Sequence, residues 1–103
     1  MVIKRDFTWT EIGILIGIKN CDNLKDITVN KMVGQIKINR SHPLFYNVLS
    51  YLLQNNLVTI DKVVGNVRLF EIDGKGIRDL LDEQILINKL INDYLKRDHH
   101  FIW

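Results

Sequence analysis

Apolar residues recur at intervals of three and four along most of this chain, and short polar segments separate these stretches. This spacing predicts amphipathic helices, whereas two shorter stretches rich in valine, isoleucine and leucine predict strands. The predicted helices cover residues 8–20, 28–36, 41–56 and 74–97. The predicted strands cover residues 57–64 and 67–73, with a very short strand at Ile27. The fold class is therefore mainly α with a small β-hairpin.

The first predicted helix begins with a recognisable start signal. Thr8 and Glu11 have the spacing of a capping box, and Ile16 belongs to the apolar stripe that follows. Gly13 and Gly17 each cost about 1 kcal/mol inside a helix. Their four-residue spacing predicts that another element packs closely against this helix.

The second and third helices are separated by a four-residue turn, residues 37–40. Thr28 is the expected cap of the second helix. Ser41 begins the third helix, where Pro43 is tolerated because its missing N–H is not needed in the first turn. Asn56 is the expected left-handed residue that closes it. The expected inward residues of the two helices are Val29, Met32, Val33, Ile36, Phe45, Leu49, Leu52 and Leu53.

The two strands are joined by a turn of two residues. Gly65 and Asn66 are a typical pair for a tight hairpin. Both strands mix polar and apolar residues, so the sequence does not distinguish between two registers that differ by one residue. Asp73 follows the second strand and is placed to cap the last helix.

Composition limits the class of protein. The chain has 103 residues, of which 47% are hydrophobic and 25% charged, which fits one folded domain. No apolar run approaches the roughly 18 residues of a membrane span, and the first residues become polar too soon for a secretory signal. We therefore expect a cytoplasmic protein with no membrane partner. Cys21 is the single cysteine, and we expect a small buried thiol.

Charge is distributed unevenly along the chain. The net charge is only +2, but from Thr28 to Arg68 Asp61 is the single acid. The bases in this stretch are Lys31, Lys37, Arg40, Lys62 and Arg68. A basic middle followed by a nearly neutral tail indicates an anionic partner for the middle of the chain.

Two strings in the basic region resemble winged helix-turn-helix domains. "SHPLFYNVLSYLLQNNLVT" is similar to the recognition helix and its exit, with Asn56 where these domains usually have glycine. "RLFEIDGKG" resembles the end of the wing in PadR- and MarR-like regulators, with Asp73 in place of the usual threonine. The small size and the bias toward Ile, Asn and Lys resemble regulators of archaea, their viruses or plasmids. The resemblance implies a single domain: helix-turn-helix core and wing over residues 1–73, and a dimerisation helix and tail over 74–103.

The resemblance gives the third helix a role as a reader of double-stranded DNA. A helix fixed by its apolar face fits the major groove with the other face. Asn47 is suited to pair with adenine, and the hydroxyl groups are suited to phosphates or base edges. For Tyr51, the sequence does not decide between contact with DNA and packing within the domain. The expected contacts from this helix are Ser41, His42, Tyr46, Asn47 and Ser50.

The bases near the turn and on the wing are the expected phosphate contacts. Lys31, Lys37 and Arg40 surround the turn into the third helix, where charge sets affinity and register. Lys62, Asn66 and Arg68 are the expected contacts of the wing with the backbone or the minor groove. Valines next to the wing tip leave a second interpretation open, in which the tip contacts a protein.

The last predicted helix has a wider apolar stripe than one small core can cover. An exposed stripe of this kind indicates a partner chain, so we expect a homodimer that presents two recognition helices to two half-sites. The expected interface residues are Ile87, Leu90, Ile91 and Tyr94.

Nothing in the sequence indicates enzyme chemistry, a cofactor or a metal. The histidines and the lone cysteine lack the spacing of a zinc site, and "GKG" at 74–76 is too short for a phosphate-binding loop. The leading hypothesis is a sequence-specific DNA-binding transcriptional regulator that acts as a homodimer. The alternatives are a winged-helix module that binds proteins in a transcription or replication assembly, and a nonspecific architectural DNA binder.

Overall fold

The structure of the chain, a computed structural model, describes residues 6–39 and 41–86. The labelled elements are α1 (Trp9–Lys19), the 3₁₀ turn η1 (Asn20–Asn23), α2 (Val29–Ile36), α3 (Pro43–Gln54), β1 (Val58–Val64) and β2 (Val67–Ile72). A further helix covers residues 74–86. The chain is therefore mainly helical with one antiparallel hairpin, which confirms the coarse fold class predicted from the sequence.

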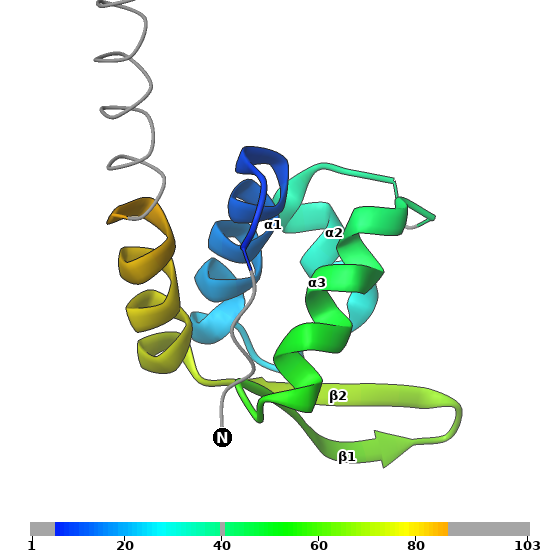
Figure 1. Cartoon of the computed structure of the whole chain (residues 1–103). Coiled ribbons are helices and arrows are strands. Elements are labelled where there is room, and N and C mark those ends of the chain that lie inside the picture. Colours follow the sequence, from blue (N-terminus) through cyan, green and yellow to red (C-terminus); the bar gives the residue numbers. More distant parts are fainter. Residues whose placement is uncertain (1–5, 40, 87–103) are drawn as a thin grey trace, which may run out of the picture.

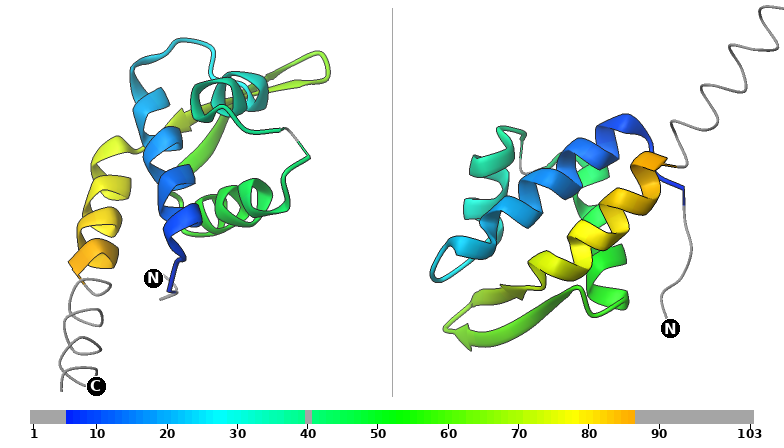
Figure 2. Two further views of the ribbon diagram at one scale, coloured as in Figure 1. Left: turned by 90° about the horizontal axis from the view of Figure 1, so that it is seen from above. Right: turned by 90° about the vertical axis from the view of Figure 1, so that its left-hand side faces the viewer.

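The helices gather on one side of the hairpin. Figure 1 shows α1 between helix 74–86 on one side and α2 and α3 on the other. The hairpin passes the ends of the helices and projects beyond them, as the two further views in Figure 2 also show. The arrangement leaves α3 and the hairpin accessible on the same side of the molecule.

One hydrophobic core connects all of these elements. The backbone N–H of Phe7 donates a hydrogen bond of 3.1 Å to Oε1 of Gln84, which ties the N-terminal segment to helix 74–86. The ring of Phe7 meets Tyr51 edge-on at 5.0 Å between ring centroids, so Tyr51 belongs to the core. The largest fully buried side chains are Phe45, Leu15, Ile18, Met32, Leu52, Ile77, Val48, Val58 and Cys21.

Short-range caps determine where the helices begin. The capping box of Thr8 and Glu11 is present in both directions, and the Thr28 hydroxyl accepts from the backbone N–H of Lys31 at 3.2 Å. Oδ1 of Asp73 accepts from the backbone N–H of Gly76 at 3.0 Å. These three predictions are confirmed. The predicted short strand at Ile27 is present as an isolated bridge to β2.

The prediction that Ser41 begins the third helix is wrong. The helix begins at Pro43, and His42 is its N-cap because Nδ1 of His42 accepts from the backbone N–H of Leu44 at 3.2 Å. A residue before proline is sterically kept out of the helical region, and His42 accordingly has φ −62° and ψ 120°. The Ser41 hydroxyl instead donates to Oδ1 of Asn39. Asn56 follows α3 with φ 58°, which confirms the left-handed exit.

The apolar stripe of α1 is narrower than predicted. Ile16 is 41% exposed because neighbouring elements cover the other faces of the helix. The two glycines also differ. A Cβ atom at Gly17 would collide with the side chain of Ile36, whereas a Cβ atom at Gly13 would have no atom within 4 Å beyond its chain neighbours and the backbone of its own helix. Of these two glycines, only Gly17 is required for the close packing of α1 against α2.

Cys21 is a structural thiol. It is fully buried, and its Sγ donates to the backbone oxygen of Gly17 at 3.4 Å. Burial, together with the neighbouring Asp22 carboxylate, raises the pKa of the Cys21 thiol. The thiol is therefore protonated and unreactive at neutral pH.

Within the described residues, no helix is both long and apolar enough to cross a membrane. The predicted extension of the last helix to residue 97 lies outside these residues, as do the predicted interface residues Ile87, Leu90, Ile91 and Tyr94.

The two glycines of α1 provide a matched test of this packing. Gly13→Ala should raise the free energy of unfolding by about 0.5–1 kcal/mol, because alanine is the better helix former. Gly17→Ala should lower it by about 1–3 kcal/mol, because the added methyl group overpacks against Ile36. Urea unfolding followed by circular dichroism measures both. An equal gain for the two variants would contradict the close approach of α1 and α2.

Candidate nucleic-acid interface

A groove of about 550 Å³ lies where the beginning of α2, the outer face of α3 and the hairpin meet. Its floor contains Leu49 and Phe70, which are buried core residues. Its more exposed lining provides hydroxyl groups, amides and one guanidinium, that of Arg68. The lining residues are Thr28, Val29, Asn30, Tyr46, Leu49, Ser50, Leu53, Asn66, Val67, Arg68 and Phe70. None of them is acidic, so the groove favours a polar or anionic occupant.

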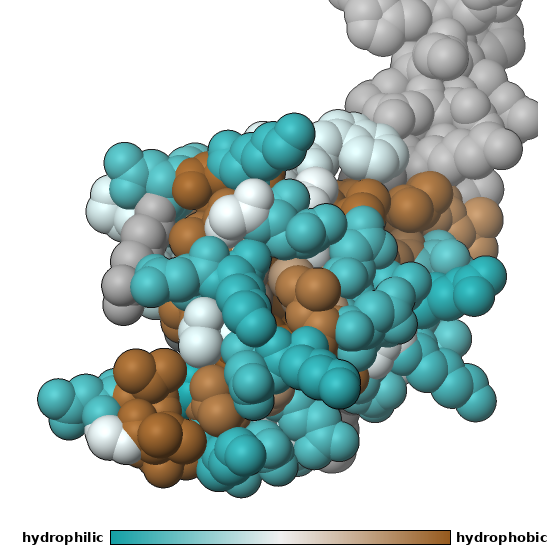
Figure 3. Space-filling view, turned by 180° about the vertical axis from the view of Figure 1, so that it is seen from behind, coloured by the Kyte–Doolittle hydropathy of each residue, from teal (hydrophilic) through white to brown (hydrophobic). Residues whose placement is uncertain are grey.

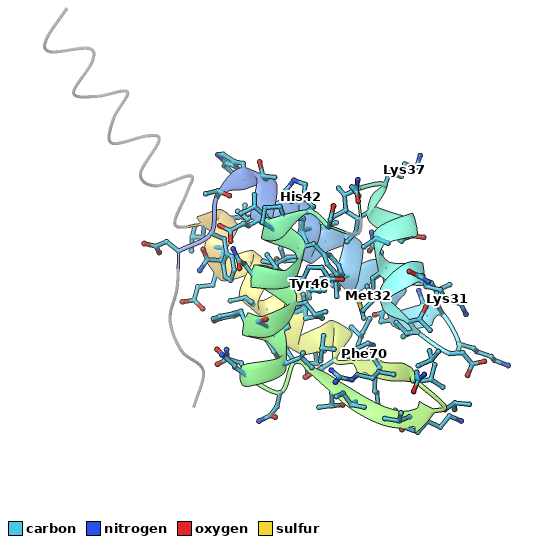
Figure 4. The ribbon with its side chains drawn as sticks, turned by 90° about the vertical axis from the view of Figure 1, so that its right-hand side faces the viewer. Lys31, Met32, Lys37, His42, Tyr46 and Phe70 are labelled. Atoms are coloured by element: carbon cyan, nitrogen blue, oxygen red, sulfur yellow. The ribbon has the colours of Figure 1, made fainter. Side chains whose placement is uncertain are left out.

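The core determines which α3 side chains face this groove. Phe45, Val48 and Leu52 are fully buried, which turns Tyr46 and Ser50, one helical turn apart, to the outside. The ring of Tyr46 meets Phe45 edge-on at 5.2 Å between centroids and remains 40% exposed. Figure 4 shows His42 and Tyr46 along α3.

Asn47 is also exposed on α3. It is not part of the groove lining; it lies one residue further around the helix than Tyr46. The outer face of α3 therefore has two parts, one turned to the groove and one turned to solvent. The phase that the sequence predicts for Asn47 is confirmed, because its side chain is outside the core.

The hairpin contributes through an unexpected irregularity. Its tip has the predicted two-residue turn, with Val64 opposite Val67, and Gly65 carries the positive φ of 61° that such a turn requires. Between Ile60 and Lys62 the register shifts, so Asp61 forms a β-bulge. The bulge adds one residue to β1 and changes which face each side chain takes.

The bulge makes the strand register set by the turn compatible with the register that buries Val58. Below it, Ile60 lies opposite Phe70 and Val58 opposite Ile72, so Val58 shares the core face with Phe70. If Asp61 were paired and β1 had no bulge, the register at the tip would continue with Asp61 opposite Phe70 and Ile60 opposite Glu71. That register would turn Val58 away from the core, since a one-residue slip exchanges the two faces of a strand. Burial of Val58 therefore explains the bulge.

The register of the turn separates two side chains that the sequence groups together at the tip. Between the bulge and the turn, Lys62 lies opposite Leu69 and Val63 opposite Arg68. Directly opposite residues share a face, so Lys62 and Arg68 point to opposite faces of the hairpin. Arg68 lines the groove, whereas Lys62 is exposed on the other side.

Of the remaining predicted contacts, Lys37, Ser41 and His42 lie toward the connection between α2 and α3, whereas Lys31 lies near the beginning of α2. Lys37 ends α2 in the left-handed conformation, with φ 64°, and Figure 4 shows it at the end of α2 remote from the hairpin. Ser41 and the N-cap His42 precede the first turn of α3 at that end of the molecule. The ammonium group of Lys31 donates to the backbone oxygen of Lys25, which directs it to the loop before α2. Arg40 lies outside the described residues.

Two polar residues of the groove are absent from the contacts predicted from the sequence. Thr28 and Asn30 belong to the beginning of α2 and line the groove beside α3 and the hairpin. The sequence identifies Thr28 only as a helix cap. Their position beside Ser50 and Arg68 depends on tertiary packing, which no local signal in the sequence reveals.

Comparison with family models, with curated proteins and with solved structures found no match for this chain. Among the residues that the structure describes, no three His, Cys, Asp or Glu side chains are grouped as metal ligands. The interpretation of the groove therefore rests on its own geometry and chemistry.

Deletion of Asp61 tests the bulge. Asp61 has no partner in the strand register, so the shortened strand can pair regularly from Lys62 opposite Leu69 to Ile60 opposite Phe70 and still bury Val58. The free energy of unfolding should therefore change by less than about 1 kcal/mol. Asp61→Ala keeps the bulge and should change the free energy by less than about 0.5 kcal/mol. Urea unfolding measures both variants. A loss of about 2–4 kcal/mol on deletion, as expected from exposing one or two apolar side chains, would contradict the assignment of Asp61 as the extra residue.

Proposed function

We propose that the chain is a winged helix-turn-helix protein that binds specific sequences of double-stranded DNA as a homodimer and regulates transcription. The observation that carries this proposal is the groove between the polar face of α3 and the hairpin, with Arg68 in its lining and no acidic residue. In this proposal α3 is the recognition helix and the hairpin is the wing. The order of the helices and the hairpin along the chain supports both roles.

The geometry supports a definite mode of docking. The major groove admits one α-helix, and α3 offers an exposed face with Tyr46, Asn47 and Ser50. When α3 occupies the major groove, the projecting wing lies over the neighbouring minor groove. The sugar-phosphate strand between these two grooves then falls into the groove between α3 and the wing.

The lining of this groove has the chemistry that a phosphate strand requires. Phosphate oxygens accept hydrogen bonds from hydroxyl groups, amides and guanidinium groups. Ser50 and Tyr46 provide hydroxyl groups, Asn66 an amide, and Arg68 a guanidinium with fixed, forked donors. The absence of carboxylates from the lining avoids repulsion of the strand.

The opposite end of α3 offers a second set of backbone contacts. Lys37 is exposed at the end of α2, and Arg40 follows three residues later. In His42, Nδ1 is occupied as an acceptor, which leaves Nε2–H as the donor toward a partner. Contacts at both ends of α3 would fix its position along the duplex, and Asn47 between them would read a base edge.

The homodimer is supported by apolar surface at the end of helix 74–86. Ile85 is 40% exposed and Leu86 57% exposed, and the sequence continues the apolar pattern through Ile87, Leu90, Ile91 and Tyr94. Pairing of two copies through this region would cover the stripe. A two-fold dimer would then present two recognition helices to two half-sites.

A second candidate function is a winged-helix module that binds a protein in a transcription or replication assembly. The exposed valines of the hairpin tip favour it, because contiguous apolar surface is typical of protein contacts. The cationic, acid-free groove favours DNA. Binding of duplex DNA therefore decides between the two functions.

Arg68 and Arg78 provide a matched pair of variants that tests DNA binding by the groove. Both are exposed arginines, so replacing either with alanine removes one positive charge, but Arg78 lies on helix 74–86, away from the groove. Arg68→Ala should weaken binding to a mixed-sequence duplex about tenfold and reduce the slope of log K against log salt by about one. Arg78→Ala should leave both unchanged. Fluorescence anisotropy at several salt concentrations measures the affinity and the salt slope of each variant.

Two results of this experiment would contradict the proposed function. One is a wild-type chain that does not bind duplex DNA at low salt, which would favour the protein-binding module. The other is an equal effect of Arg68→Ala and Arg78→Ala, which would show that only the net charge matters and that the groove is not the contact.

The dimer has its own test. Replacing Leu90 and Ile91 with aspartate should give a monomer or an unstable chain, because charges would be buried in the interface. Leu24→Asp is the control, since Leu24 is an exposed leucine of the segment between η1 and α2. Light scattering at micromolar concentration gives the molar mass. A wild-type mass of one subunit would contradict the homodimer.

A further inference from the structure

We propose that the tip of the hairpin is an apolar wedge that enters the DNA minor groove and bends the duplex. The wedge consists of Val63, Val64 and Val67, which flank the turn residues Gly65 and Asn66. This inference rests on the proposed function, and it adds a mechanical role for side chains that contact with the backbone alone would not require.

The three valines are at least half exposed. Val63 and Val64 are each 59% exposed and Val67 is 50% exposed. Figure 3 shows this hydrophobic surface on the projecting end of the hairpin. An exposed apolar edge of a two-stranded sheet favours unwanted pairing with other chains, so its presence at a projecting tip indicates a contact that covers it.

The charges of the hairpin favour DNA as the partner that covers its tip. From residue 62 to residue 70 the hairpin has no acidic side chain, and its two bases lie on opposite faces, Lys62 on one and Arg68 on the other. The minor groove is bordered by a phosphate strand on each side. A hairpin inserted between them would offer one cation to each strand, which a single apolar pocket on a protein would not require.

The size of the hairpin predicts deformation of the duplex. The minor groove of B-DNA is about 6 Å wide. Two paired strands are about 4.8 Å apart, and here Val63 and Val64 stand on opposite faces and add to the thickness. Entry therefore requires a wider groove. Apolar side chains that enter the minor groove partly unstack the bases and bend DNA by about 20–90°.

The two turn residues suit the part of the hairpin that enters the minor groove first. Gly65 has no side chain and carries the positive φ of the turn, which keeps the tip narrow. Asn66 follows it and lies in the lining of the groove with Arg68. An amide at this position can donate to the acceptors on adenine and thymine edges in the minor groove. Flexible pyrimidine–purine steps would be favoured under the tip, because they bend at lower cost.

Energy transfer between the ends of a bound duplex tests the wedge. The probe is a short duplex, selected from a random library by the wild-type chain and labelled at both ends with a donor and an acceptor. The test variant replaces Val63, Val64 and Val67 with threonine, which keeps the shape and the β-propensity but adds hydroxyl groups. Ile60→Thr, on the same strand below the tip and 45% exposed, is the control.

The wedge predicts a bend of about 20–90° with the wild-type chain and with Ile60→Thr. The triple variant should lose most of this bend and bind the selected duplex about tenfold more weakly. A wild-type chain that binds an unbent duplex would overturn the wedge and leave the proposed function intact. The same conclusion follows if the triple variant binds and bends like the wild type, and the tip would then serve a protein contact. If the wild-type chain selects no duplex, both proposals fail.

Discussion

The packing of α3 against the other helices determines which of its side chains a partner can reach. Phe45, Val48 and Leu52 are fully buried, and successive residues of a helix are 100° apart around its axis. Fixing three positions of one face therefore fixes the opposite face, where Tyr46, Asn47 and Ser50 are exposed. The proposed reading of DNA depends on this rotation of the helix, because a shift of one residue would bring Asn47 into the core.

The hairpin is coupled to the same core through a single extra residue. Val58 must share the core face with Phe70, and the tight turn sets a different register at the tip. The bulge at Asp61 satisfies both requirements, whereas the register of the turn places Lys62 and Arg68 on opposite faces. Core packing thus determines the exposed face of α3 and the register at the base of the hairpin, and the turn determines the charge pattern at the tip.

Local signals made much of the fold predictable from the sequence. Thr8, Thr28 and Asp73 cap helices through bonds that span three residues, and the Gly65 turn needs only its own neighbours. The start of the third helix was predicted wrongly because the steric effect of Pro43 on the preceding residue outweighs the capping preference of Ser41. The bulge, the exposure of Ile16 and the participation of Asn30 in the groove all depend on contacts between segments distant in sequence, which periodicity does not reveal.

The central claim is that α3 reads base edges in duplex DNA, and Asn47→Ala tests it most directly. We expect a folded variant that binds the site selected by the wild-type chain about 5- to 150-fold more weakly, which corresponds to about 1–3 kcal/mol. In selection from a random library, its preference should relax at one base pair in each half-site, while binding to nonspecific duplexes stays the same because the phosphate contacts remain. A folded variant that selects the same sequences with the same affinity would contradict the account.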